Sequence, residues 1–172
     1  MLTYGPFFFT LLPFLRLLKM KHVHDTLFDM NCPFCEDPRI RTQKIFENEL
    51  VFAFPTNIPI TPGHTLVCPK RHASALSELT TEELQTLMTL GTKITVALKK
   101  VFGAEGFNFA WNEGEAAGQS IPHLHLHIVP RKAGDAGIYE YEPRKFLYRP
   151  GSREKSPDAE LEAVAQLITQ NL

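Results

Sequence analysis

Histidine alternates with aliphatic residues over residues 123–128, a pattern typical of a β-strand. Successive side chains of a strand point to opposite faces, so His123, His125 and His127 are predicted to share one face while the aliphatic residues between them enter a core. Because only 7 of the 172 residues are histidine, chance would produce such a run in roughly one chain in a hundred. The pattern therefore indicates a strand that carries a functional site.

The composition is that of an ordinary globular domain, with 44% hydrophobic and 22% charged residues among 172. This length suffices for one domain with its own core, and the composition excludes disordered and fibrous classes. A formal charge of -1 and a pI near 6.7 produce no field that attracts nucleic acid. We expect no nucleic-acid partner, and any nucleotide would be bound by local groups such as the basic pairs Lys70-Arg71 and Arg131-Lys132.

Three cysteines are an odd number for a disulfide framework, and two of them form the motif Cys32-x-x-Cys35. This usage favours a reducing compartment and a metal or redox role, so a cytoplasmic location is predicted. Cys68 lies in a predicted strand, where a buried apolar thiol is expected.

Residues 1–21 form an apolar extension that lacks a basic leader region and a small-residue cleavage site, so a signal peptide is not expected. Pro6, Pro13 and Arg16 interrupt the stretch, and no membrane association by a spanning helix is expected. Two interpretations remain: an extension that docks on a surface or core, or a natural start at Met20. The missing targeting features favour the second.

The remaining chain predicts an α+β fold with an antiparallel five-stranded sheet and helices on one face. Thr80 and Glu83 have the spacing of a capping box that opens a helix to about residue 100, and Ser156 precedes a last helix to about residue 170. A domain over residues 22–140 and a C-terminal segment over 141–172 are predicted. The expected strands are 43–47, 51–54, 64–68, 107–111 and 123–129.

The two thiols of Cys32 and Cys35 have the spacing of half a tetrahedral zinc site. A redox dithiol is the alternative, but it usually opens a helix in a βαβ pattern, which the sequence lacks. Nitrogen or oxygen ligands would complete the site, and His72 and His123 are candidates. A surface or capping role for His72 is the simpler alternative.

The loop over residues 112–120 is rich in glycine and polar residues. Gly118 allows backbone N–H groups to approach an anion, and Gln119 and Ser120 add side-chain donors. Beside an imidazole, such a loop suits phosphoryl chemistry. The alternative is a plain connection between strands.

These motifs together resemble those of the histidine triad family of nucleotide hydrolases and transferases. The resemblance extends from about residue 32 to 131 and rests on separated motifs in the expected order. It implies a two-layer α+β fold, usually a homodimer, that acts on nucleoside phosphoramidates or dinucleoside polyphosphates. The motifs are His-Leu-His-Leu-His-Ile-Val, Pro62-Gly63-His64-Thr65-Leu66-Val67, Pro69-Lys70-Arg71-His72 and Asn112-Glu113-Gly114.

The resemblance implies that His125 is the nucleophile, which attacks the α-phosphorus and forms a nucleotidyl-histidine that water then cleaves. An imidazole with a pKa near 6.5 is largely neutral at pH 7, so its lone pair can attack without a separate base. His127 matches the position that contacts the phosphate and assists the leaving group. The further active-site residues that the resemblance implies are Ser120 and Gln119 as phosphate donors, with Asn112 and His64.

Metal-binding members of the family place zinc on residues that match four positions here. The zinc would be structural, because four protein ligands leave no open position. For the nucleoside, Phe34 and Phe54 match the base pocket, but Thr56, with Asn57 beside it, stands where relatives carry a ribose-binding acid or amide. The matched zinc ligands are Cys32, Cys35, His72 and His123.

Two other functions are compatible with parts of the pattern. The three histidines could ligate one catalytic metal, but side chains at i and i+4 of a strand are about 13 Å apart at the backbone. A nucleotide-binding interaction protein with little turnover is the other candidate, and it would not need the intact set of His125, Ser120 and Gln119.

Overall fold

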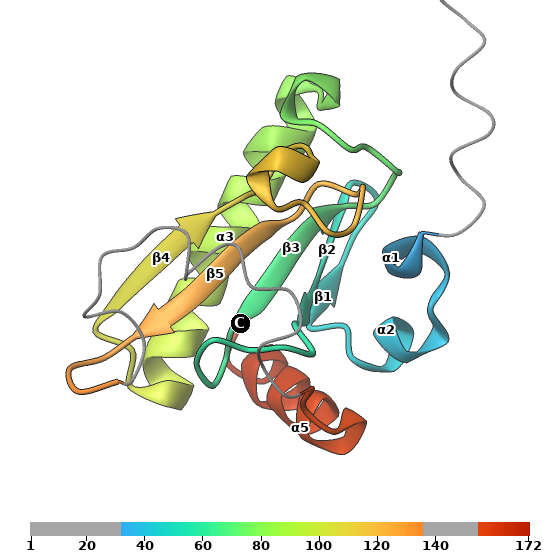
Figure 1. The fold of residues 1–172 in the computed structure, drawn as a ribbon. Helices are drawn as coiled ribbons and strands as arrows, with labels where there is room; N and C mark the ends of the chain where they lie inside the picture. Colours follow the sequence, from blue (N-terminus) through green and yellow to red (C-terminus); the bar gives the residue numbers. More distant parts are fainter. Residues whose placement is uncertain (1–31, 136–154) are drawn as a thin grey trace, which may run out of the picture. The chain divides into compact units, whose positions relative to one another are not determined.

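An antiparallel sheet of five strands, in the order β1-β2-β3-β5-β4, organises the fold (Figure 1). The computed structural model describes residues 32–135 and 155–172. All of these belong to one unit, which extends from Cys32 to Leu172. The strands are β1 (Phe46–Glu47), β2 (Val51–Pro55), β3 (Thr65–Pro69), β4 (Gly106–Ala110) and β5 (Leu126–Arg131).

Among the described residues, two long helices and four short ones accompany the sheet. The long helices are α3 (Thr81–Phe102) and α5 (Asp158–Thr169). Two short α-helices lie before the sheet, α1 (Pro33–Glu36) and α2 (Pro38–Thr42), and each has proline in its first turn. Proline suits this position because the first N–H groups of a helix have no intrahelical acceptor. Two 3-10 helices are η1 (Leu76–Glu78) and η2 (Glu115–Ala117).

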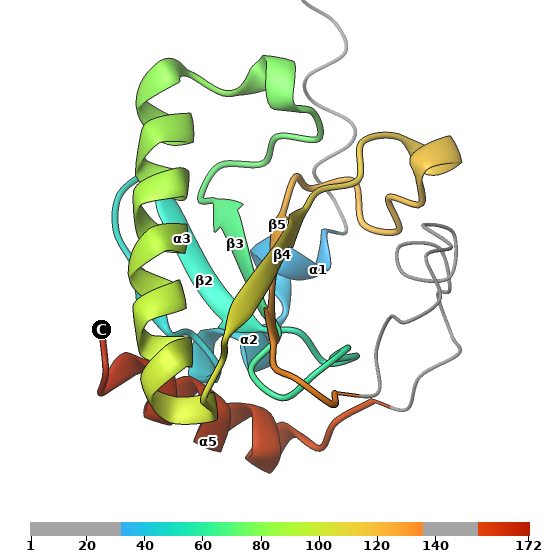
Figure 2. The ribbon, with the colours of Figure 1, turned by 90° about the vertical axis from the view of Figure 1, so that its left-hand side faces the viewer.

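The central strands β2 and β3 are buried along their whole length because helices pack on both faces of the sheet. Val51 and Ala53 of β2 belong to the core shared with α3 and α5, whereas Phe52 and Phe54 belong to a second core with Ile40 of α2. This division follows the period of two of a strand. Figure 2 shows α3 along one side of the sheet and α1 on the other.

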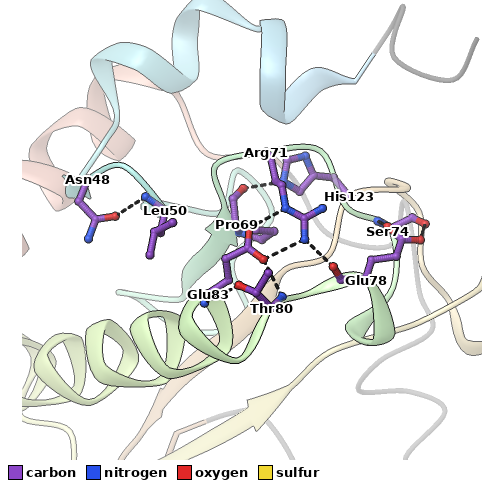
Figure 3. A network of polar contacts seen from close by, with 9 residues as sticks. All are labelled: Asn48, Leu50, Pro69, Arg71, Ser74, Glu78, Thr80, Glu83 and His123. Atoms are coloured by element: carbon purple, nitrogen blue, oxygen red, sulfur yellow. Dashed lines mark hydrogen bonds and ion pairs between the residues drawn. The ribbon is translucent and has the colours of Figure 1, made fainter. Parts of the chain in front are cut away.

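Hydrogen bonds connect the start of α3 to the segment that follows β3 (Figure 3). Thr80 and Glu83 form the capping box, and Glu83 also accepts two hydrogen bonds from Arg71, at 2.6 and 2.8 Å. The side chain of Glu83 is only 6% exposed, whereas that of Arg71 is 47% exposed. The hydrogen bonds from Arg71, followed by those from Thr80, lower the pKa of Glu83 to about 2 against the opposing effect of burial. This ion pair fixes the chain just before His72.

Gly63 allows the sharp turn that leads into β3. Its φ of +88° is rare for residues with a side chain. A Cβ atom there would lie 2.8 Å from Cδ2 of Phe102 and 2.9 Å from Cδ2 of Leu98. Glycine therefore permits the close approach of this turn to α3, which sets the position of His64.

The structure confirms the predicted α+β class, the capping box and the C-terminal helix. It corrects the predicted strand over 123–129, since β5 begins only at Leu126 and His123 and His125 precede it. The predicted first strand over 43–47 shortens to Phe46–Glu47, because residue 43 caps α2. The helices α1 and α2 were not predicted.

The predictions for residues 1–21 and the domain boundary at 140 lie outside the described residues. Within the described residues, none of the helices has the length and apolar character needed to cross a bilayer. Cys68 has no exposed surface, and burial raises the pKa of its thiol, as expected for a core cysteine.

The Arg71–Glu83 pair predicts a specific pH dependence of stability. The folded pKa of Glu83 lies below its ordinary value of 4.5, so its stabilising effect is complete above about pH 5 and is lost as pH falls towards 2. Glu83→Gln retains a capping-box side chain but removes the charge. We expect it to lower the unfolding free energy at pH 7 by about 1–2 kcal/mol, with water screening the half-exposed guanidinium.

Urea denaturation of both proteins between pH 7 and pH 3 measures this effect. The matched control is Glu82→Gln, which removes an exposed acid from the same first turn of α3. The difference between wild type and Glu83→Gln should shrink at acid pH. A difference that stays constant over this range would contradict the assignment.

Candidate active site and metal centre

Four potential metal ligands from three separate segments meet near the end of β3. Cys32 caps α1 and Cys35 lies within it, His72 follows β3, and His123 precedes β5. One ligand atom from each residue lies within 4.8 Å of the other three. These are the four residues that the sequence analysis assigned to a metal.

His123 is held so that one ring nitrogen faces the two sulfurs. Its Nε2 donates to the carbonyl oxygen of Pro69 at 2.9 Å (Figure 3), and a carbonyl can only accept. The lone pair of neutral His123 is therefore on Nδ1, which lies 3.4 Å from Sγ of Cys32 and 3.4 Å from Sγ of Cys35. The carbonyl fixes the tautomer that a metal ligand needs.

The donor set fits a tetrahedral site of the zinc type. Sγ of Cys35 is 3.8 Å from Nδ1 of His72. Ligand atoms bound to zinc at about 2.0–2.3 Å would be roughly 3.4–3.8 Å apart in a tetrahedron, which matches the separations to Cys35. Two thiolates and two imidazoles also form a soft set that selects zinc over calcium or magnesium. These residues could hold a metal ion.

His125 points away from the metal cluster and into a cavity. It is 5% exposed, and its Nδ1 donates to the backbone carbonyl of His123 at 2.7 Å. In the neutral ring this leaves the lone pair on Nε2. Burial lowers the pKa of His125, and the hydrogen bond to the carbonyl opposes this with a smaller effect. Both the geometry and the burial favour a neutral ring with one available nitrogen.

A chain of hydrogen bonds fixes the tautomer of His127 as well. The backbone N–H of Ile60 donates to Nδ1 of His64 at 3.2 Å, so Nε2 of His64 carries the proton. Nε2 lies 3.0 Å from Nδ1 of His127 and donates to it. The other nitrogen of His127 is then an N–H donor, next to the ring of His125 at 4.8 Å between centroids.

The three alternating histidines therefore differ in the partners of their ring nitrogens. Only His123 belongs to the metal-ligand group found among the described residues. His125 presents a lone pair and His127 presents a donor, because each uses its second nitrogen differently. The alternative of one metal bound by all three histidines does not fit this arrangement.

A cavity of about 310 Å³ opens beside His125. Its walls include Phe34 and Phe54, whose rings meet edge to face at 5.2 Å. The edge-to-face contact of Phe34 with His125, also at 5.2 Å, places this apolar wall against the imidazole. Of the predicted site residues, the lining contains Phe34, Phe54, Thr56, Asn57, His64, Ser120, His125 and His127.

Gln119, Asn112 and Gly118 are hydrogen-bonded within the loop over residues 112–120 and to the segment beside it. The Gln119 side chain accepts from the N–H of Gly114 at 2.7 Å and donates to the carbonyl of Ser74 at 2.8 Å. Asn112 donates to the carbonyl of Gly118 at 3.4 Å, and the N–H of Gly118 donates within the loop. None of the three lines the cavity. They shape the loop that presents Ser120, and direct contact with substrate stays a prediction.

The cavity also contains polar residues that no sequence pattern indicated. Gln43 donates to Asp158 at 3.1 Å across 115 positions of sequence. Local patterns contain no signal for such a pair, because the two residues meet only after α5 has packed on the sheet. The unpredicted polar residues of the lining are Asp37, Arg39, Gln43 and Asp158.

Comparison with known proteins gives consistent matches. The family model described as the HIT domain matches residues 37–134. The bis(5'-adenosyl)-triphosphatase of Dictyostelium discoideum is 36% identical over 119 residues, or 69% of this chain and 76% of that protein. The asymmetrical bis(5'-nucleosyl)-tetraphosphatase of Schizosaccharomyces pombe is 41% identical over 96 residues, or 56% of this chain and 53% of that protein.

A solved structure with a bound metal is also similar. The Zn-bound histidine triad family protein from Mycobacterium smegmatis has a TM-score of 0.63 to this chain at 28% identity. The match covers 82% of this chain and 94% of that protein. The similarity therefore includes most of the fold in both proteins.

Proposed function

Since this chain belongs to the HIT domain family, we propose that it is a hydrolase that cleaves the α-phosphate of a nucleotide substrate. The observation that carries the proposal is the orientation of His125, whose Nδ1–H is bonded to a carbonyl while Nε2 remains available in a cavity. Dinucleoside polyphosphates and nucleoside phosphoramidates are the proposed substrate classes. The names of the Dictyostelium and Schizosaccharomyces relatives support the first class.

The proposed reaction has two steps. Nε2 of His125 attacks the α-phosphorus, a P–N bond forms, and the bond to the leaving group breaks with its electron pair on the leaving group. A phosphate departs as the anion, whereas the amine of a phosphoramidate takes up a proton from solvent as it leaves. His127 and Ser120 donate hydrogen bonds to the phosphate oxygens and to the departing group. Water then attacks phosphorus, the P–N bond breaks with its pair returning to Nε2, and a proton passes to solvent.

The resident metal is proposed to be a structural zinc. When bound, zinc would hold Cys32, Cys35, His72 and His123 in a closed shell and supply no open position for chemistry. Within this site the position of His123 matters for His125, because the backbone carbonyl of His123 accepts a hydrogen bond from Nδ1 of His125. A reducing cytoplasm, as predicted, would keep the two cysteine ligands available as thiols.

A homodimer is also proposed, formed by pairing of β4 with a second β4. Within the described part of the chain β4 is the last strand of the sheet, so one of its edges presents unpaired backbone groups. Phe109 is 49% exposed on this strand and would be covered in a symmetric dimer.

The nucleophile assignment predicts that His125→Ala loses at least about a thousandfold in kcat on diadenosine triphosphate and on an adenosine phosphoramidate. Quenching with alkaline detergent after addition of α-labelled substrate should trap label on His125 in the wild type, because the P–N bond of a nucleotidyl-histidine is labile in acid but survives in alkali. Thermal melting verifies that the variant is folded. Tight AMP binding without turnover by the wild type would instead support the nucleotide-binding interaction protein.

The metal assignment predicts about one zinc per chain by elemental analysis. Cys35→Ser should lower the zinc content and the melting temperature, because metal binding contributes to folding. Cys68→Ala is the matched control, since Cys68 is buried in the core and is not a member of the ligand group, and it should retain zinc. Zinc-free wild type from a metal-replete preparation would overturn the assignment.

The dimer assignment predicts that light scattering finds twice the chain mass for the wild type. Phe109→Glu should shift the mass towards the monomer because a charge would be buried at the interface. Leu167→Glu is the control, since Leu167 of α5 is 46% exposed and lies on a different element. A monomeric wild type, or a dimer insensitive to Phe109→Glu, would contradict the proposed interface.

A further inference from the structure

The C-terminal helix contributes a carboxylate to the cavity that holds His125. Asp158 is the first residue of α5 and lines this cavity. The HIT domain match ends at residue 134, so Asp158 lies outside it. A residue from beyond the matched domain therefore borders the proposed substrate site.

Asp158 is held in place by three features of the fold. Its Oδ1 accepts from Nε2 of Gln43 at 3.1 Å, and the Gln43 side chain is buried at 4% exposure. The backbone N–H of Ser156 donates to the carbonyl of Asn57 at 2.8 Å, which ties the start of α5 to the turn after β2. Further along α5, Ala165 and Ile168 are buried in the main core. These hydrogen bonds and the packing of α5 therefore fix the position of the Asp158 carboxylate.

The charges at this place favour an uncharged ligand group with hydrogen-bond donors. Asp37 also lines the cavity, but it accepts hydrogen bonds from three donors of Arg39, which are Nε, Nη2 and the backbone N–H. The guanidinium of Arg39 is paired with Asp37 and also interacts electrostatically with Asp158, so these two carboxylates and one guanidinium leave a net negative charge. An ionised carboxylate offers about four lone-pair positions, and Gln43 uses one of those on Asp158. A phosphate would be repelled here, while hydroxyl or amino groups would be bound.

Thr56 lines the same cavity and brings a hydroxyl group but no charge. It is 6% exposed, and its Oγ1 accepts from the N–H of Ile58 at 3.4 Å. A hydroxyl in this setting cannot replace a charged acceptor. Asp158 is the carboxylate that the fold brings to the turn next to Thr56, through Ser156 and Asn57.

We propose that Asp158, positioned by Gln43, determines specificity by accepting hydrogen bonds from a pair of neighbouring donors on the nucleoside. The donors are the vicinal hydroxyls of ribose or the amino edge of the base. The proposal rests on the proposed function and deepens it, because it orients the nucleotide. The phosphate faces the histidines and the nucleoside donors face α5.

The test compares Asp158→Asn with wild type in equilibrium binding of nucleotides by calorimetry. Asn is similar in size but loses the charge, so AMP should bind about tenfold more weakly. If ribose supplies the donors, binding of 2',3'-dideoxy-AMP should be the same in both proteins. If the base supplies them, purine riboside monophosphate should instead bind equally well to wild type and to Asp158→Asn.

Glu160→Gln is the matched control, because Glu160 lies in the same first turn of α5 and does not line the cavity. It removes the same charge from the same helix end and should bind AMP like wild type. Equal weakening of all ligands by Asp158→Asn would reveal a merely structural role and overturn the proposal. Unchanged AMP binding in this variant, or a wild type that binds no AMP, would overturn it as well.

The role proposed for Asp158 and the proposed hydrolase activity can be refuted independently of each other. A wild type that binds AMP but turns over no substrate would refute the hydrolase while the binding difference still supports Asp158. A wild type that turns over substrate, with AMP binding unaffected by Asp158→Asn, would keep the hydrolase and refute the specificity role.

Discussion

The ring and backbone of His123 connect the metal cluster to the proposed nucleophile. Its Nε2–H is bonded to the carbonyl of Pro69 at the end of β3, and its Nδ1 faces the sulfurs of Cys32 and Cys35. Its own carbonyl accepts from Nδ1 of His125. A single residue with no exposed surface therefore links β3, α1 and the cavity. Displacement of His123 would disturb the metal ligands and the lone pair of His125 together.

The same residue type occupies three different environments within five positions. His123 is fully buried and has a carbonyl and two sulfurs as neighbours, whereas His125 is buried against the ring of Phe34. His127 is less buried and accepts from His64. Each environment selects a tautomer through the partner available to one nitrogen. The alternation of the sequence brings three rings close together along the chain, and the neighbours from other segments decide what each ring can do.

The sequence predicted the parts of this structure that depend on local patterns. The start of α3 follows from Thr80 and Glu83, which are three residues apart and satisfy each other's backbone groups. The metal cluster was predicted through a family resemblance, because nothing local indicates that His72 lies near Cys35. The pair Gln43 and Asp158 was not predicted at all, since it forms only when α5 packs beside α2. The start of β5 was placed too early, because periodicity does not reveal where strand pairing begins.

The C-terminal helix contributes both to the core and to the lining of the cavity. Its apolar residues Leu161, Ala165 and Ile168 are buried, and burial of aliphatic side chains contributes roughly 1.5–3 kcal/mol each for the larger ones. Removal of the helix would therefore expose core surface and take Asp158 from the cavity in one step. A loss of activity after such a truncation would not reveal which effect caused it. Substitution of the carboxylate alone leaves the apolar face of α5 intact, so only this change separates recognition from folding.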